Sequence, residues 1–370
     1  MRMSAVFFII IFVSLVILFL AHLAVYKSLV TIFALSSQTT LLSLKIFLIV
    51  FGVAFVFAML LASKYNNFFT RIFYTISASW YGILFYLLLA VAIYAILSAI
   101  FGNLLPTSIS ILGKSLVVFA LVVSVYGLWN AGHLSFTRYD VSIPNLSSSW
   151  LGKKAIWISD VHLDQVHNVE YSSRIALAIK KENPDIVFIG GDLYDGVKID
   201  EAAAIAPFKE LHPSLGVYFI TGNHEEFGDN AHYVDAVKAA GIRILNNEMI
   251  NLEGLNIIGV DDRDSTQKDI FENILIGLKI QKGAPTILLK HQPFQLDIAE
   301  KFGVSLQISG HTHRAQMYPL SLVTKLIYRG YDYGQKQYGN MQIIVSDGVG
   351  TWGPPLRVGT KSEIVVLNFK

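Results

Sequence analysis

Groups that can bind metal ions follow short apolar segments at five places in the second half of the chain. They are Asp160 and His162, Asp192 and Asp195, Asn223 with His224 and Glu225, His291, and His311 with His313. Carboxylate, amide and imidazole donors suit Mn, Fe or Zn in five- or six-coordinate geometry. The chain has no Cys, which excludes thiolate ligands and disulfides. The donors are too many for one ion and suit two ions that share a carboxylate.

Each fragment alone carries little weight. A Gly-Asp pair after a strand is usually a turn, and a lone His-x-His is more often surface or core than ligand. The acidic group Asp261, Asp262 and Asp264 is interpreted as a solvated turn. His22, His133, His167, His212 and His232 are interpreted as membrane-interface, loop or helix-surface residues. Five donor groups at successive strand ends, in contrast, indicate one site.

The elements that must position these groups are short strands alternating with helices, from about residue 134 onward. The predicted strands are 154–159, 185–190, 215–220, 255–260, 285–290, 304–309, 341–346 and 363–368, and the predicted helices are 171–182, 200–211, 230–240 and 295–302. Segment 135–149 is interpreted as an extended lead-in with a polar linker. This alternation is typical of an α/β domain with layered sheets. In such domains the site lies at the carboxyl ends of the strands.

The N-terminal part has a different composition. Seven bases and no acids occur in the first 139 residues. Apolar stretches at about 4–25, 41–62, 78–101 and 108–131 each approach or exceed the roughly 20 residues that a membrane-spanning helix needs. The first is too long for a signal peptide and lacks an evident cleavage site. We therefore predict a four-helix transmembrane domain over 1–133 and an α/β domain over 134–370.

Lys and Arg near the spans indicate the orientation. Arg2, Lys64, Arg71, Arg138, Lys153 and Lys154 fall on the side of the N-terminus and the C-terminal domain, and Lys27, Lys45 and Lys114 fall on the other or within spans. This bias predicts that both termini and the C-terminal domain lie in the cytoplasm. The expected location is a bacterial inner membrane. No basic stripe typical of nucleic-acid binding occurs, and no protein partner can be inferred.

In order and spacing, the donor groups resemble the calcineurin-like metallophosphoesterases, whose pattern is D-x-H, G-D-x-x-D, G-N-H-E/D, H and G-H-x-H. Every position is matched, and the resemblance covers about 135–370. It implies two facing β-sheets flanked by helices, a fold that strand spacing alone does not distinguish from a doubly wound sheet. Features around Asp262 and in 346–363 resemble the membrane-tethered branch of the family.

The resemblance also implies the site roles. Asp160, His162, Asp192 and His313 would hold one metal, and Asp192, Asn223, His291 and His311 the other, with Asp192 as the bridge. Mn is the expected metal, with Fe or Zn as alternatives. Two such ions activate water and stabilise a phosphoryl group. His224 would serve the leaving group as a catalytic residue, and Asp195 and Glu225 would orient the ligands.

Membrane helices suggest an amphiphilic substrate held in the lipid bilayer. The expected activity is hydrolysis of a lipid-linked phosphodiester or pyrophosphate. UDP-2,3-diacylglucosamine of lipid A synthesis is the first candidate, giving UMP and diacylglucosamine 1-phosphate. Arg314 stands where the branch often has Gly; it is expected either to contact a phosphate or to point to solvent. The apolar segment 317–338 could admit acyl chains.

Other functions remain open at this point. A cyclic-nucleotide phosphodiesterase and a phosphoprotein phosphatase are the enzymatic alternatives. A membrane scaffold that has lost catalysis is the non-enzymatic one, and the complete donor set argues against it.

Overall fold

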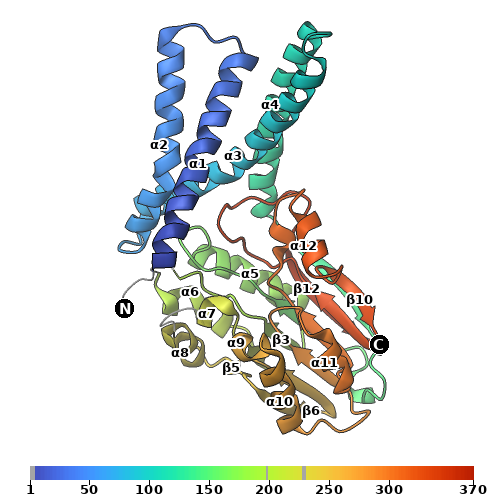
Figure 1. Ribbon diagram of the computed structural model, residues 1–370. Helices are drawn as coiled ribbons and strands as arrows, with labels where there is room; N and C mark the ends of the chain where they lie inside the picture. The colour runs from blue at the N-terminus through green and yellow to red at the C-terminus, as the bar shows by residue number, and fades with distance from the viewer. Residues whose placement is uncertain (1–4, 197–198, 227–230) are drawn as a thin grey trace. The chain divides into compact units, whose positions relative to one another are not determined.

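A computed structural model describes residues 5–196, 199–226 and 231–370 (Figure 1). The chain divides into two compact units. The helical unit comprises Met1–Trp129 with Gly353–Leu356, and the mixed unit comprises Asn130–Trp352 with Arg357–Lys370.

The helical unit confirms the four predicted apolar helices. They are α1 (Ala5–Ile32), α2 (Gln38–Ala62), α3 (Phe68–Phe101) and α4 (Pro106–Ala131). Their mean hydropathies lie between 2.1 and 2.7, and each is long enough to cross a membrane. Large apolar side chains such as Phe12, Phe57 and Phe119 are more than half exposed, as expected of helices that face lipid.

Helix α3 starts ten residues before the predicted span. Asn67 caps it, since its side chain accepts hydrogen bonds from the N–H groups of Phe69 and Thr70. The Thr70 hydroxyl in turn accepts from the N–H of Asn67, which completes a capping box. The polar residues of this first part lower its hydropathy without breaking the helix, and the apolar pattern alone therefore missed it.

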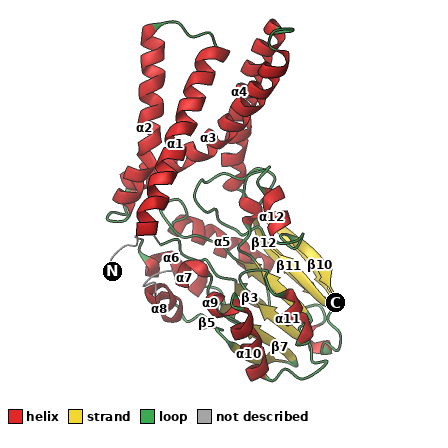
Figure 2. Ribbon diagram, in the orientation of Figure 1, coloured by secondary structure: helices red, strands yellow, loops and turns green. Residues whose placement is uncertain are grey.

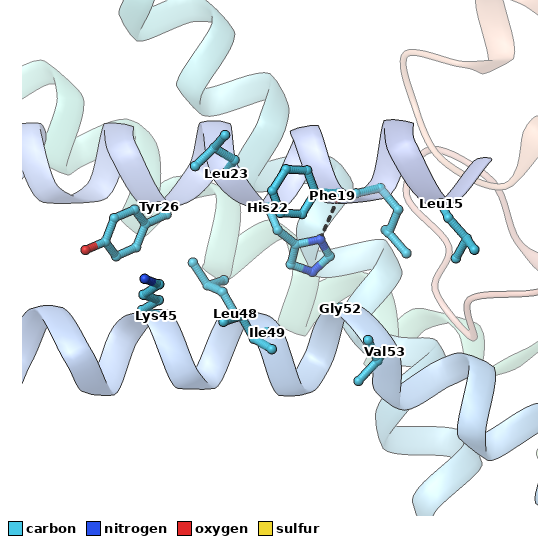
Figure 3. A pocket seen from close by; sticks show the side chains of 11 residues that line it. Leu15, Phe19, His22, Leu23, Tyr26, Lys45, Leu48, Ile49, Gly52 and Val53 are labelled. Atoms are coloured by element: carbon cyan, nitrogen blue, oxygen red, sulfur yellow. Dashed lines mark hydrogen bonds between the residues drawn. The ribbon is translucent and has the colours of Figure 1, made fainter. Parts of the chain in front are cut away.

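A cavity of about 710 Å³ lies between α1 and α2 (Figure 3). Its lining is mostly apolar, with His22, Tyr26 and Lys45 as the polar members. His22 is buried, with Nε2 3.0 Å from Trp80 Nε1 and Nδ1 2.8 Å from the Leu18 carbonyl oxygen. The interpretation of His22 as a membrane-interface residue was therefore wrong. It bridges α1 and α3 inside the unit.

The mixed unit contains two six-stranded sheets (Figure 2). The strands are β1 (Leu134–Val141), β2 (Lys154–Ile158), β3 (Ile186–Ile189), β4 (Val217–Phe219), β5 (Arg243–Ile244), β6 (Glu248–Leu252), β7 (Leu255–Gly259), β8 (Thr286–Leu289), β9 (Leu306–Ser309), β10 (Gly334–Tyr338), β11 (Met341–Val345) and β12 (Ser362–Phe369). The first sheet has the order β1-β12-β2-β3-β4-β5 and the second β10-β11-β9-β8-β7-β6. Strands β2 to β5 are parallel, as are β7, β8, β9 and β11.

Helices flank the two sheets or lie in the loops between strands. They are α5 (Val169–Glu182), α6 (Glu201–Lys209), α7 (Asn223–Glu226), α8 (Ala231–Ala239), α9 (Asp262–Ser265), α10 (Lys268–Leu278), α11 (Leu296–Lys301) and α12 (Ser321–Ile327), with short 3₁₀ turns η1 (Ser148–Trp150) and η2 (His313–Ala315). One apolar core joins the inner faces of both sheets, including Trp157, Phe188 and Ile308. Separate cores lie under α5 and α6 and under α10 and α11. The prediction of two facing sheets flanked by helices is confirmed.

Several short elements were missed. Segment 135–149, predicted as a lead-in, contains strand β1, which pairs in parallel with β12. Strands β5, β6 and β10 and helices α7, α9, α10 and α12 were not predicted. β10 is Gly-Gln-Lys-Gln-Tyr, largely exposed at a sheet edge, so it lacks the apolar alternation on which strand prediction depends.

Candidate metal centre

The five donor groups follow five parallel strands of the mixed unit. Strands β2, β3 and β4 are neighbours in the first sheet, and β8 and β9 are neighbours in the second. Asp160 and His162 follow β2, Asp192 follows β3, and Asn223 begins α7 after β4. His291 follows β8, and the two remaining histidines, His311 and His313, follow β9. The carboxyl ends of both sheets therefore supply one centre.

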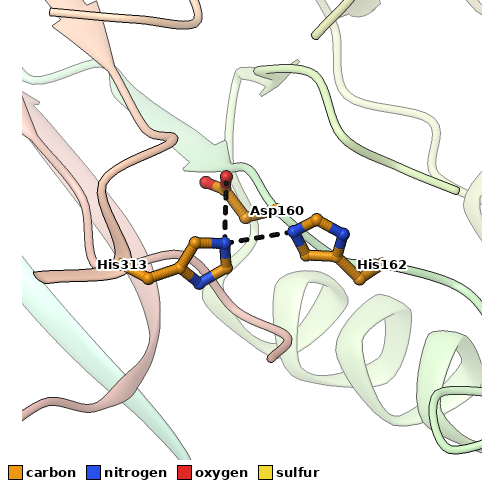
Figure 4. Close-up of side chains that lie close together, drawn as sticks. All are labelled: Asp160, His162 and His313. Atoms are coloured by element: carbon orange, nitrogen blue, oxygen red, sulfur yellow. Dashed lines mark hydrogen bonds and ion pairs between the residues drawn. The ribbon is translucent and has the colours of Figure 1, made fainter. Parts of the chain in front are cut away.

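Asp160, His162 and His313 form the first donor group (Figure 4). Nε2 of His313 lies 3.4 Å from Asp160 Oδ1 and 3.1 Å from His162 Nε2. With metal–nitrogen bonds of about 2.0–2.1 Å, adjacent ligand atoms are about 3.0–3.4 Å apart. The three atoms therefore have the spacing of ligands around one ion.

Asp192, His291 and His311 form the second group. His291 Nε2 lies 3.1 Å from Asp192 Oδ2 and 3.2 Å from His311 Nδ1. The same Asp192 oxygen lies 4.0 Å from Nε2 of His162, a member of the first group. Asp192 is thus the carboxylate that lies between the two groups, as a bridging ligand requires.

Asn223 supports the presence of an ion. Its side-chain Oδ1 is buried and has no hydrogen-bond partner among the residues that the structure describes. Leaving a buried acceptor unsatisfied costs about 1–3 kcal/mol, and a bound cation would satisfy it. The donor types, their spacing and this orphan oxygen together fit two metal ions.

The histidines are held in the orientation that ligands need. Nδ1 of His162 lies 3.1 Å from Asp195 Oδ1, and Nδ1 of His291 lies 2.8 Å from the Gly190 carbonyl oxygen. In each ring Nδ1–H donates outward, so the lone pair of Nε2 faces the centre. Metal-binding histidines are typically fixed in this way.

Glu225 joins two of the donor loops. Its buried carboxylate accepts hydrogen bonds from the backbone N–H groups of Asp192, Leu193, Tyr194 and Gly222, at 2.8 to 3.1 Å. Burial, and after it the Asp192 carboxylate, raise the pKa of Glu225 to about 7. The loops after β3 and β4 are therefore fastened together, which sets the position of Asp192.

The donor loops have an unusual backbone. Asp160, His162, Asp192, His311 and His313 all have φ between 46° and 69°. Non-glycine residues adopt this left-handed region rarely, and such residues cluster at functional sites. Gly310 allows the two sheets to approach, because a Cβ there would lie 2.4 Å from Asp160 Oδ2.

The electrostatics of the centre favour a cation. Burial lowers the pKa of His291, but the carboxylates of Asp192 and Asp160 outweigh burial and raise it well above its ordinary value. Burial also lowers the pKa of His311, to about 3. Carboxylates that draw a proton onto a buried imidazole attract a divalent cation by the same field.

His224 lies beside this centre. Its ring Nδ1 is 3.0 Å from Asp195 Oδ1, the oxygen that also contacts His162, and its backbone N–H donates to Asp192 Oδ1 at 2.9 Å. His224 also forms a possible donor group with His162 and Asp192. With 17% of its side chain exposed, His224 is more accessible than His162, which is 1% exposed. Asp195 therefore orients one predicted ligand and the predicted proton donor together.

Arg314 pairs with a buried carboxylate. Its Nε and Nη2 donate to the two oxygens of Asp347 at 2.6 and 2.5 Å, and its guanidinium lies 3.8 Å from the centre of the Tyr333 ring. Its side chain is 22% exposed, so it does not simply point to solvent. The pairing gives Arg314 a structural contact beside His313.

Two other polar side chains near the centre are buried, and for Asp262 this shows that the sequence-based interpretation was wrong. Asp262 is not in a solvated turn: it is 3% exposed, begins α9 and accepts a hydrogen bond from Gln292. His167 lies in the loop between β2 and α5, but it is buried, at 5% exposed, and packs on the Tyr171 ring. Neither sequence context carried an apolar pattern that would have indicated burial.

Arg357 is a functional neighbour whose contacts the sequence did not indicate. It is fully buried, and its Nη2 donates to the carbonyl oxygens of Asp347 and Gly350. The same nitrogen lies 3.3 Å from His313 Nδ1. The loop that it holds packs on the Asp160 loop, where Gly350 N–H donates to the Asp160 carbonyl oxygen. The available signal was its place in segment 346–363, which resembles the membrane-tethered branch of the family.

The fold and the centre define an α/β metal-dependent hydrolase. The family model of the calcineurin-like phosphoesterases matches residues 153–315. An uncharacterized metallophosphoesterase of Aquifex aeolicus is 33% identical, over 68% of this chain and 97% of that protein. The chain therefore belongs to the calcineurin-like metallophosphoesterases, whose members use a dimetal site, and it is a phosphoesterase.

Similarity extends through the helical unit in one relative. An uncharacterized metallophosphoesterase of Campylobacter jejuni is 28% identical over 99% of both chains. A protein of Danio rerio described as a transmembrane protein with metallophosphoesterase domain is 30% identical, over 69% of this chain and 62% of that one. With its four apolar helices, the chain is a membrane protein. Among solved structures, a dimetal phosphatase from Danio rerio matches 54% of this chain and 88% of that one, at 11% identity and a TM-score of 0.36.

Proposed function

We propose that the protein hydrolyses a lipid-linked phosphodiester or pyrophosphate at the membrane. The observation that carries this proposal is a complete donor set on a chain that also contains four apolar helices. Membrane helices bring an enzyme to substrates that stay in the bilayer, and a freely soluble substrate does not require them. UDP-2,3-diacylglucosamine is the proposed substrate, with UMP and diacylglucosamine 1-phosphate as products.

The proposed ligand sets share Asp192. One ion would be held by Asp160, His162, Asp192 and His313, and the other by Asp192, Asn223, His291 and His311. When bound, the two ions supply an activated water and Lewis-acid stabilisation of the phosphoryl oxygens. Mn²⁺ is the proposed metal, because carboxylate, amide and imidazole donors without thiolate suit it.

His224 is proposed to protonate the leaving oxygen. Asp195 holds its Nδ1 at 3.0 Å, and Nε2 is the ring nitrogen proposed to face the substrate. A single fixed carboxylate then sets the tautomer of His224 and the orientation of His162. General acid catalysis requires that the donor be positioned within hydrogen-bond reach of the leaving atom.

Product analysis tests the substrate. Full-length protein loaded with Mn²⁺ is incubated with vesicles that contain UDP-2,3-diacylglucosamine, other lipid phosphodiesters and pyrophosphates, and the products are identified by mass spectrometry. We expect UMP and diacylglucosamine 1-phosphate. Hydrolysis of other lipids alone would reject the named substrate. Activity confined to cyclic nucleotides or phosphoproteins would reject a lipid substrate.

We also propose that the mixed unit lies in the cytoplasm of a bacterium, on the inner membrane. Six bases flank the spans on its side, against three on or near the other. Because the chain has no Cys, single cysteines at positions 153 and 36 can be labelled in intact cells. An impermeant reagent is expected to label position 36 only. Labelling at position 153 would contradict the orientation.

A further inference from the structure

Helix α12 exposes an apolar face beside the metal centre. Leu322, Val323, Leu326 and Ile327 are between 51% and 79% exposed, and Tyr318 just before the helix is 53% exposed. The four helix positions are spaced i, i+1, i+4 and i+5, which places them on one side of a helix. Single exposed apolar residues are common on proteins, but a cluster of this kind marks an interaction surface.

The opposite side of α12 is fastened to the domain. Thr324 is buried, and its hydroxyl lies 3.2 Å from Asp332 Oδ2. The Tyr328 ring stacks on Phe294, with ring centres 4.8 Å apart. These contacts hold the helix in place. The exposed apolar side chains therefore belong to a fixed surface and not to a loosely packed segment.

The exposed charges of α12 and the turn after it are positive, and the nearby Asp332 is buried. No Asp or Glu occurs from Phe302 to Tyr331. Lys325 and Arg329 are exposed and lie three residues from Leu322 and Leu326, at the border of the apolar face. Apolar residues bordered by bases are typical of helices that lie in the interface of an anionic membrane.

The candidate spanning helices keep the mixed unit near a membrane. Only Gly132 and His133 separate the end of α4, a candidate spanning helix, from the start of β1. Two residues span at most about 7 Å, so the mixed unit is tethered close to a bilayer surface. The chemistry of the α12 face matches this neighbour, which is present whether or not another protein binds.

We propose that the α12 face, defined as Tyr318, Leu322, Val323, Leu326 and Ile327 with Lys325 and Arg329, inserts into the interface of an anionic bilayer. The helix is joined through residues 316–320 to η2, the turn that carries His313. Contact of α12 with lipid would therefore bring the metal centre to the membrane surface. This inference concerns membrane contact and stands apart from the identity of the substrate.

Depth-dependent fluorescence quenching in the full-length protein tests the proposal. Leu326→Cys carries a polarity-sensitive fluorophore, in nanodiscs that contain anionic lipids with nitroxides on their acyl chains. Ile276→Cys on α10 is the control, since Ile276 is 56% exposed, as is Ile327. An interfacial helix buries its apolar face about 5–10 Å into the headgroup and acyl boundary, so we expect at least about twofold stronger quenching at position 326.

Three results would overturn the proposal. One is equal quenching at positions 326 and 276. Another is a blue-shifted emission at 326 that the nitroxide lipids do not quench, which would indicate a protein partner, including a second copy of the chain. The third is unchanged quenching at 326 after Lys325→Gln and Arg329→Gln, which would remove the role of anionic lipid. None of these measurements depends on hydrolytic activity.

Discussion

Asp192→Asn is expected to abolish hydrolysis and to lower metal occupancy at both sites. Asp192 Oδ2 lies 3.1 Å from His291 and 4.0 Å from His162, one member of each donor group. The amide keeps the shape of the side chain but removes the charge and directs N–H groups at one set of ligands. Loss of a residue that hydrogen-bonds to a metal ligand typically lowers metal affinity or activity by about 10–100-fold. Loss of a ligand shared by both ions is therefore expected to lower activity by more than about 100-fold.

A matched control separates this effect from a general effect of the substitution. Asp200 caps α6 by accepting from the Ala203 N–H and belongs to none of the donor groups. Asn caps helices as well as Asp does, so Asp200→Asn should leave activity and metal content unchanged. Full occupancy of both sites in Asp192→Asn, measured by elemental analysis, would reject the bridging role.

His224→Ala is expected to keep both metals and to lose turnover by roughly 10²–10⁴-fold, the usual contribution of general acid–base catalysis. The physical reason is that His224 is assigned to the leaving group and not to an ion. The loss should be smaller with a nitrophenyl ester, because nitrophenolate departs without protonation. Steady-state turnover on both substrates, with metal analysis of the same sample, makes the measurement.

The alternative role for His224 is that of a metal ligand, since it also lies within a possible donor group with His162 and Asp192. Loss of metal in His224→Ala would identify it as a ligand. A near-normal rate on the lipid substrate would reject any catalytic role. His232, about half exposed on α8, provides a control: His232→Ala should change neither quantity.

The α/β class was predictable from the sequence because the central strands are mostly apolar, whereas the two facing sheets were implied by the family resemblance. Strands β2, β3, β8 and β9 are buried on both faces. A donor residue follows the end of each strand within two or three residues. The short edge strands were not predictable. Residues of β5 and β10 are partly exposed and are ordered by pairing, which a local pattern does not record.

The convergence of the donors also depends on contacts that spacing cannot give. Asp160 and His313 are far apart in sequence and meet because Gly310 lets the loops of the two sheets approach. Glu225 joins the loops after β3 and β4 by accepting hydrogen bonds from four of their N–H groups. The family pattern placed these residues in one site, and the structure adds what holds them there.

Buried charged residues outside the motif were the least predictable. Asp262 and Arg357 are polar in sequence but almost completely buried in the fold. Arg357 is stabilised by carbonyl oxygens of a loop that closes on it, an arrangement that only the folded chain creates. Composition assigns such residues to the surface because charged side chains are rarely buried.

The metal content of the purified full-length protein tests the dinuclear centre most directly. The protein is stripped with a chelator, titrated with Mn²⁺ and assayed for bound metal per chain and for phosphodiester hydrolysis at each step. Two ligand sets that share Asp192 predict a plateau at two ions per chain, with full activity only as the second ion binds. A plateau at one ion with full activity, or hydrolysis by the metal-free protein, would contradict it.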